Sequence, residues 1–167
     1  LYINGSRKYS GSNVTRSNSM PISIGSSVNG LTWNNTIEMQ GFISDFAIFN
    51  SAKYSGTTLT IPTSPLSSSG SELHIKGTDA SIIDKSQINH LKIHGNTTGS
   101  TTQVKFANTK SVYFDGSSDY ISAPTNKLFG FSTNDFTVEF WVYFNDVNNP
   151  ITIYSNLSSA SGLQPHL

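Results

Sequence analysis

The residues of this 167-residue sequence best suited to chemistry are two acids separated by a short glycine-containing stretch. In "SVYFDGSSDYISAP", residues 111–124, two runs rich in β-forming residues flank Asp115 and Asp119. Two carboxylates across a tight loop, together with backbone carbonyls, supply the hard oxygen ligands that Ca²⁺ prefers, so one interpretation is a calcium site. The other interpretation is a turn, because an Asp before Gly opens hairpin loops and its carboxylate accepts hydrogen bonds from turn N–H groups.

Carboxylates also catalyse glycoside hydrolysis, which requires two of them facing one cleft about 5–10 Å apart. The clearest strand pattern of the chain, residues 136–144, carries a single acid, Glu139, with Thr137 and Trp141 two residues to either side. Glu139 has no partner on that strand. This half of the chain is therefore not expected to be a glycanase, and we expect no enzymatic activity of the chain as a whole.

The stretch "HLKIH" places His90 and His94 four residues apart. On a strand the two histidines share a face, but they are about 13 Å apart at a rise of about 3.3 Å per residue. One metal ion cannot bridge that separation with ligand bonds of about 2 Å. We expect Leu91 and Ile93 to point to the core and both histidines to face solvent.

Residues 136–144 alternate between apolar side chains and a second set that contains two aromatic residues and an acid. Five apolar residues on one face predict a central strand against the core, with Trp141 on the face opposite Phe140. Aromatic rings stack on the apolar faces of sugars and Glu accepts hydrogen bonds from hydroxyl groups, so the second face predicts a glycan-binding surface. Alternatively, neighbouring loops or strands cover it. The apolar set is Phe136, Val138, Phe140, Val142 and Phe144, and the candidate glycan-binding residues are Glu139, Trp141 and Tyr143.

The composition limits the classes of partner and cofactor. Charged residues make up 12% of the chain and the formal net charge is zero, whereas nucleic-acid binding needs clustered Lys and Arg. The absence of cysteine excludes disulfides and thiolate metal sites. No apolar run approaches the roughly 18 residues that span a bilayer. We expect no nucleic-acid partner and no membrane insertion.

Short β-rich segments separated by Gly, Asn, Ser and Pro recur along the chain, a pattern typical of an all-β sandwich or barrel. Asn4-Gly5 in the opening "LYING" predicts a hairpin. The apolar residues Ile43 and Phe46 break the period of two, which predicts a β-bulge at Ser44-Asp45. The Pro/Ser/Gly-rich residues 60–71 predict a linker.

The chain resembles laminin-G-like domains of the concanavalin A-like jelly-roll type. "VYFDGSSDYISAP" followed by "FSTNDFTVEFWVYF" is similar to the amino-terminal half of such a domain, and so is the upstream "LHIKGTDASIIDKSQINHLKIHGN". "LYINGS", "PISIGSS" and "GFISDFAIFNSAKYSG" are similar to the carboxy-terminal half. The resemblance predicts an all-β antiparallel sandwich segment that spans two tandem modules: residues 1–66 end one module, 60–71 link, and 72–167 begin the next.

The resemblance implies a non-catalytic, lectin-like module that recognises cell-surface glycans. The stretches "GFISDF", "AKYSG" and "PTSPL" are most similar to sequences in tandem modules of bacteriophage fibre-like and other surface proteins. This similarity implies a virion or extracellular location. Calcium sites occur in laminin-G-like domains, and Asp45 would be a third ligand beside Asp115 and Asp119. Alternatives are a structural module that packs against neighbouring virion or surface subunits in a larger oligomeric assembly, and an accessory domain of an enzyme.

The inverted order of the two halves allows two outcomes. Residues 1–66 and 72–167 could pair with each other as a permuted sandwich, because the first and last strands of family modules lie together. Alternatively, chain outside these residues, or a neighbouring subunit, completes each half. Unpaired strand edges favour the second outcome, so we expect the chain to lie within something longer and to assemble when isolated.

Overall fold

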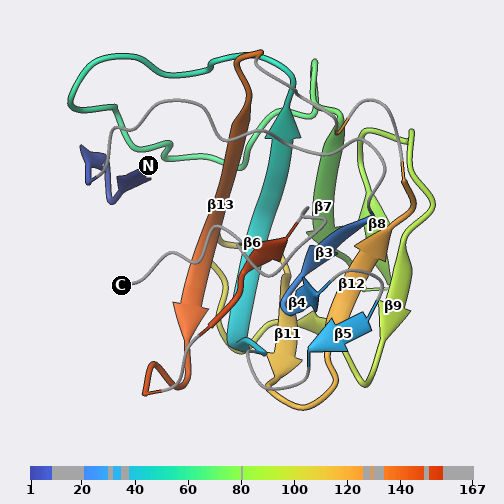
Figure 1. Ribbon diagram of the computed structural model, residues 1–167. Coiled ribbons are helices and arrows are strands. Elements are labelled where there is room, and N and C mark those ends of the chain that lie inside the picture. The colour runs from blue at the N-terminus through green and yellow to red at the C-terminus, as the bar shows by residue number, and fades with distance from the viewer. Residues whose placement is uncertain are drawn as a thin grey trace.

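The computed structural model describes residues 1–8, 21–29, 32–34, 38–79, 81–125, 129, 134–148 and 151–155. Its named elements are all β-strands, and no α-helix occurs in these residues (Figure 1). The fold is therefore all-β with antiparallel sheets, as the sequence predicted. In the same residues there is no helix long and apolar enough to cross a membrane.

The larger sheet is built around one long strand, β6 (Gln40–Phe49). Strand β13 (Thr137–Phe144) pairs with β6 along one edge, at the left of the sheet in Figure 1. The other edge of β6 pairs with two strands in succession, first β11 (Ser111–Asp115) and then β7 (Leu73–Gly77). The sheet continues with β10 (Thr98–Ser100) beside β11 and with β8 (Ile82–Asp84) beside β7.

The smaller sheet has four strands, and two short strand pairs stand apart from both sheets. In order, the four strands are β14 (Tyr154–Ser155), β3 (Ile22–Ile24), β12 (Tyr120–Ala123) and β9 (Lys92–His94). The separate pairs are β1 (Tyr2–Ile3) with β2 (Ser6–Arg7), and β4 (Ser27–Asn29) with β5 (Thr32–Asn34).

The hairpin predicted at Asn4-Gly5 is present between β1 and β2. Asn4 has a φ of 48° and Gly5 a φ of 78°, and a type I′ turn requires positive values at both positions. The hairpin lies against the connection that follows β6: Arg7 N donates to Thr57 O at 3.0 Å and Leu59 N donates to Gly5 O at 2.9 Å.

Both sheets contribute to one hydrophobic core. Phe46 of β6, Phe114 of β11 and Ile121 of β12 have no exposed surface. The ring of Phe114 packs closely on Gly25, where a Cβ would lie 2.4 Å from it; with a φ of 91°, this position strongly favours glycine. The core residues are Ile22, Ile24, Met39, Ile43, Phe46, Ile48, Leu73, Ile75, Ile82, Val112, Phe114, Ile121, Ala123, Phe129, Ile153 and Tyr154.

Strand β13 has the two faces that its sequence predicted. Phe140 stacks on Phe46 with ring centroids 5.5 Å apart, whereas Trp141 lies on the opposite face, against Phe106. Among the described strands β13 pairs with β6 alone, so in these residues it lies at an edge of the sheet and not at the predicted central position. Its core-facing side chains are consequently only partly buried.

A β-bulge is present in β6, at Asp45-Phe46, one residue after the predicted Ser44-Asp45. Glu139 pairs with Ala47 and Trp141 pairs with Ser44, so two residues of β6 lie opposite the single residue Phe140 of β13. Asp45, the first of those two residues, has a φ of 57°. The extra residue returns Phe46 to the core face and leaves Asp45 on the outer face of the sheet.

Strand β9 is an edge strand of the smaller sheet. Ile93 pairs with the buried Ile121 but is itself 39% exposed, so the expectation that Ile93 points into the core is only partly met. His94 does not simply face solvent: its ring stacks on Tyr120, with centroids 3.8 Å apart. Burial lowers the pKa of His94, with a smaller effect from the nearby charge of Lys92.

The segments 1–66 and 72–167 pair with each other in both sheets. β6, from the first segment, pairs with β7, β11 and β13 from the second, and β3 pairs with β12 and β14. This is the permuted pairing that the sequence left as an alternative. The jelly-roll topology and the division into parts of two tandem modules stay predictions.

The shared core makes a prediction about stability. We expect Phe46→Ala to lower the free energy of unfolding by about 3–5 kcal/mol, because it removes a fully buried ring that packs on strands from the second segment. Unfolding in urea, followed by circular dichroism, measures the change. Val147→Ala is the control, since Val147 is 65% exposed and should change stability by less than about 0.5 kcal/mol. A loss below about 1 kcal/mol for Phe46→Ala would contradict the shared core.

Candidate functional site

Two segments cover part of the outer face of the larger sheet. The connection after β6 includes the predicted linker, residues 60–71, where Leu66 N donates to Asp45 Oδ2 at 2.9 Å. The loop between β10 and β11, residues 101–110, lies against β13, where the ring of Phe106 meets Trp141 edge-on at 5.8 Å. Residues of this loop help to line two separate hollows.

The first hollow has a volume of about 360 Å³, and we call it the aromatic hollow. Phe42 forms its base, with the ring of Tyr113 at 4.8 Å and that of Tyr143 at 6.2 Å. Tyr143 is 52% exposed, so its ring is accessible to a ligand. None of its lining residues is charged. They are Phe42, Ser100, Thr102, Gln103, Tyr113, Tyr143 and Asn145.

The three predicted glycan-binding residues have different surroundings. Tyr143 lines the aromatic hollow. Trp141 is partly covered by Phe106, and Lys105 Nζ lies 4.1 Å from the centroid of its ring. Glu139 accepts a hydrogen bond from the hydroxyl of Tyr54. Burial, then this bond, raises the pKa of Tyr54 to about 12. The alternative in the sequence interpretation was that neighbouring loops or strands cover this face. It describes two of the three residues, Glu139 and Trp141, which loop residues contact.

Sequence reasoning missed Tyr113, Gln103 and Asn145 in the aromatic hollow. The signal for Tyr113 was present, because Val112 and Phe114 are buried and alternation places Tyr113 on the outer face. Gln103 lies in an irregular loop and carried no such signal.

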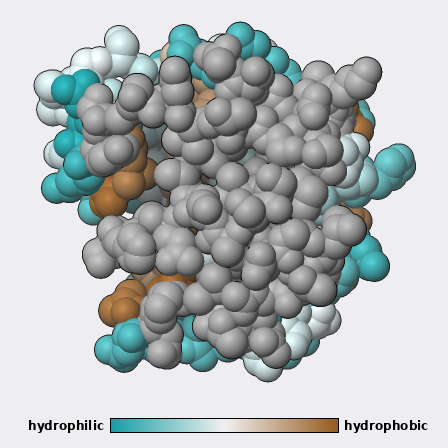
Figure 2. All heavy atoms as spheres, in the orientation of Figure 1, coloured by the Kyte–Doolittle hydropathy of each residue, from teal (hydrophilic) through white to brown (hydrophobic). Residues whose placement is uncertain are grey.

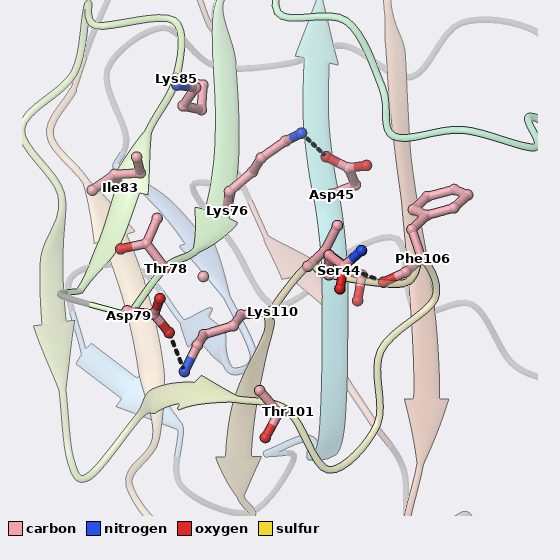
Figure 3. Close-up of a pocket in the computed structure, with 13 residues that line it drawn as sticks. Ser44, Asp45, Lys76, Thr78, Asp79, Ile83, Lys85, Thr101, Phe106 and Lys110 are labelled. Atoms are coloured by element: carbon pink, nitrogen blue, oxygen red, sulfur yellow. Dashed lines mark hydrogen bonds and ion pairs between the residues drawn. The ribbon is translucent and has the colours of Figure 1, made fainter.

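The second hollow is a groove of about 580 Å³ beside β7 and β8, which we call the lysine groove (Figure 3). Lys76 extends from β7 toward Asp45, with Nζ 3.0 Å from Oδ1, and Lys110 lies 2.8 Å from Asp79. Lys85 also lines it. The complete lining is Ser44, Asp45, Lys76, Gly77, Thr78, Asp79, Ile83, Lys85, Thr101, Phe106, Asn108, Thr109 and Lys110.

Asp45 is buried at the inner end of the lysine groove and is fully engaged. His74 Nε2 donates to Oδ1 at 2.8 Å, and Oδ2 accepts the Leu66 N–H. Burial would raise the pKa of Asp45, but the hydrogen bonds from His74, Leu66 and Lys76 outweigh it and lower the pKa. His74 is 1% exposed, and its Nδ1 has no hydrogen-bond partner among the described residues.

Asp115 and Asp119 lie in one loop whose hydrogen bonds are those of a turn. Asp115 Oδ1 accepts the N–H of Ser117 at 2.7 Å. Both oxygens of Asp119 accept backbone N–H groups, from Asn96 at 2.7 Å and from Asp115 at 2.8 Å. Gly95 leaves room for this carboxylate, since a Cβ there would lie 2.2 Å from Asp119 Oδ1.

A third acid, Glu38, approaches this loop by accepting the N–H of Ser118. Burial raises the pKa of Asp119; its backbone hydrogen bonds oppose this, and the charge of Asp115 adds to it. Burial also raises the pKa of Glu38, the bond from Ser118 opposes it, and the charges of Asp119 and Asp115 add to it. The three acids are thus close enough to repel one another.

The structure does not bring Asp45 to the two acids of the loop. Asp115 pairs with Gln40, and Asp45 lies five residues further along β6, about 16 Å away at the rise of a strand. Among the described residues, no group of three His, Cys, Asp or Glu side chains is arranged to hold a metal ion. Calcium binding by Asp115 and Asp119 stays a prediction.

No protein-family model, curated protein or solved structure matches this chain.

The turn makes a testable prediction in calcium-free buffer. We expect Asp119→Ala to lower the free energy of unfolding by about 2–4 kcal/mol, because the N–H groups of Asn96 and Asp115 both lose their acceptor. Asp119→Asn keeps one carbonyl oxygen and should lose less. Urea unfolding of both variants measures the difference, and equal losses would contradict this role of the carboxylate.

The calcium interpretation adds a separate measurement. If Ca²⁺ binds, a millimolar addition should raise the melting temperature of the wild type and not that of Asp115→Asn. The Asn side chain can still accept the Ser117 N–H, so the turn itself is retained in this variant. An unchanged melting temperature in both proteins would leave only the turn.

Proposed function

We propose that the chain is a non-catalytic, lectin-like recognition module that binds a glycan at the aromatic hollow. The observation that carries the proposal is the combination of accessible tyrosine rings with uncharged polar side chains in one hollow. Aromatic rings pack on the C–H faces of sugars. The amides of Gln103 and Asn145 and the hydroxyls of Ser100 and Thr102 can donate to and accept from sugar hydroxyl groups.

Size and charge support the same proposal. A volume of about 360 Å³ lies toward the small end of ligand sites, which are about 300–1,000 Å³, and it suits a short saccharide. The hollow has no acidic lining residue, whereas glycoside hydrolysis needs two carboxyl groups. Glu139 is hydrogen-bonded to Tyr54, and Asp45 is paired with His74 and Lys76. Binding without catalysis is the function that these side chains support.

The laminin-G-like resemblance supports the biological setting of this proposal. In that setting, the module belongs to a virion or extracellular surface protein, and its partner is a glycan on a cell surface. An accessory role beside an enzyme would use the same hollow.

Tyr143→Ala tests the proposed function. We expect wild-type protein to bind a subset of glycans on an array, and Tyr143→Ala to weaken that binding at least ten-fold, since stacking on an accessible ring is lost. Isothermal titration with the strongest array glycan gives the ratio of dissociation constants. Ile88→Ala is the matched control, because Ile88 is also exposed, at 49%, and does not line the hollow. Absence of glycan binding by the wild type would overturn the proposal.

A structural or assembly module is the second candidate function, and the edge of β13 favours it. β13 is long, pairs only with β6 among the described strands, and contains no Lys or Pro to block further pairing. Figure 2 shows small separate patches of hydrophobic residues of the described chain at the left-hand rim of the face drawn there. The partly exposed core face of β13 could be completed by a strand from a neighbouring subunit.

The assembly candidate predicts a mass above that of the monomer. We expect light scattering to detect a dimer or larger species, and Val142→Lys to convert it to monomer, since an inward-pointing lysine on an edge strand opposes pairing. Val142→Thr, close in shape to valine, should retain the assembly. A wild-type monomer of 18.1 kDa at all concentrations would contradict the assembly role and leave glycan binding unaffected.

A further inference from the structure

We propose that the lysine groove binds the carboxylate of an acidic sugar unit, so that the recognised glycan carries a negative charge. This inference rests on the proposed function, because the groove would hold one part of a glycan whose neutral part occupies the aromatic hollow. The two hollows share the 101–110 loop: its residues Thr102 and Gln103 line the first, and Thr101 and Phe106 line the second.

The groove has a surplus of positive charge in a chain that is neutral as a whole. Three lysines line it and two acids oppose them. Asp45 is buried, with 5% of its side chain exposed, and is held by His74 as well as by Lys76. Lys85 forms no ion pair with any residue that the structure describes. An anion entering the groove therefore meets ammonium groups that the protein neutralises incompletely.

Asp79 shows that a carboxylate fits beside Lys110. Its oxygen lies 2.8 Å from Lys110 Nζ, yet 93% of the Asp79 side chain is exposed (Figure 3). An ion pair this exposed contributes little to stability, because water and salt screen it. A ligand carboxylate can thus take the place of Asp79 at little cost. Asp79 is in the turn between β7 and β8 and can move aside without disturbing the sheet.

Other groups in the groove suit a sugar ring. The ring of Phe106 lines the groove, and Thr101 and Asn108 offer a hydroxyl and an amide. The hydroxyl of Thr109 is already used, since it donates to the carbonyl of Phe106 at 2.6 Å. An aromatic ring beside uncharged donors and a cation matches a saccharide that bears a carboxylate.

The number of lysines favours one carboxylate over a polyanion. Nucleic acids and comparable polyanions require a stripe of several Lys and Arg residues, and their binding releases many counterions. In this groove two of three lysines already have carboxylate partners. A single carboxylate can be held by Lys110, and Lys85, which lies at the opposite end of the groove in Figure 3, adds to the positive charge there.

The test compares carboxylated glycans with neutral counterparts of the same sugar sequence. The probes are sialyllactose with lactose, and a galacturonate tetramer with its methyl ester, printed on one array beside a general glycan set. The proteins are the wild type, Asp79→Asn, the double variant Lys85→Gln/Lys110→Gln, and Tyr143→Ala. Titration calorimetry at low and high salt then measures the best pair, with melting temperatures as a check of folding.

We expect the wild type to prefer the carboxylated member of a pair. Asp79→Asn should strengthen that binding about two- to five-fold, since Lys110 loses its competing partner, and should leave the neutral counterpart unchanged. The double lysine variant should bind both members equally. High salt should reduce the preference of the wild type.

The two proposals fail differently. Equal binding of charged and neutral members by the wild type, or a preference unchanged in the double lysine variant, overturns the acidic-sugar inference and leaves glycan binding in place. Absence of binding to every glycan by every protein overturns the proposed function and this inference with it. Carboxylated binding that survives Tyr143→Ala in full would contradict a shared ligand.

Discussion

The structure depends on the hydrogen bonding of both edges of β6. Its ten residues carry three of the central core side chains, and these are buried only when β13 lies on one side and β11 and β7 on the other. β6 comes from the first segment of the chain and all of these partners come from the second. An unpaired β6 would expose two rows of N–H and C=O groups together with Phe46. Sheet, core and outer face therefore form together.

The β-bulge in β6 links this central strand to the outer surface. Without the extra residue, strict alternation would place Asp45 on the core face beside Ile43. With it, the carboxylate of Asp45 lies outside, where it accepts hydrogen bonds from His74, Lys76 and the N–H of Leu66. Asp45 thus attaches the connection after β6 to the sheet and orients Lys76 at the inner end of the lysine groove. Asp45, which the sequence suggested as a metal ligand, thus forms hydrogen bonds and an ion pair within the described fold.

The features that the sequence predicted correctly are those that depend on residues close together in the sequence. Asn4-Gly5 determines its own turn, and the two faces of β13 follow from a period of two. Contacts between distant residues were not predictable in this way: Tyr54 lies 85 positions from the Glu139 that it covers. The same limitation explains why β13 was expected at the centre of a sheet. Its apolar face indicates burial, but which strand has partners on both edges depends on tertiary pairing. The outward position of Tyr113 could have been predicted from the alternation along its strand. The position of Gln103, in an irregular loop, could not.

Trp141, which the sequence suggested as a sugar-stacking residue, contacts the 101–110 loop in the structure. Phe106 meets its ring edge-on, and the ammonium group of Lys105 lies over it, a contact worth about 0.5–1 kcal/mol at an exposed site. Trp141 therefore supports the 101–110 loop, and part of its ring is covered by Phe106 and Lys105. The pairing of β10 with β11 holds both ends of that loop. A wall fixed at its ends and at Phe106 can present Gln103 to one hollow and Thr101 to the other without reordering on binding. For the proposed ligands, such preorganisation would reduce the entropic cost of binding, and Trp141 would then position the loop that lines both hollows.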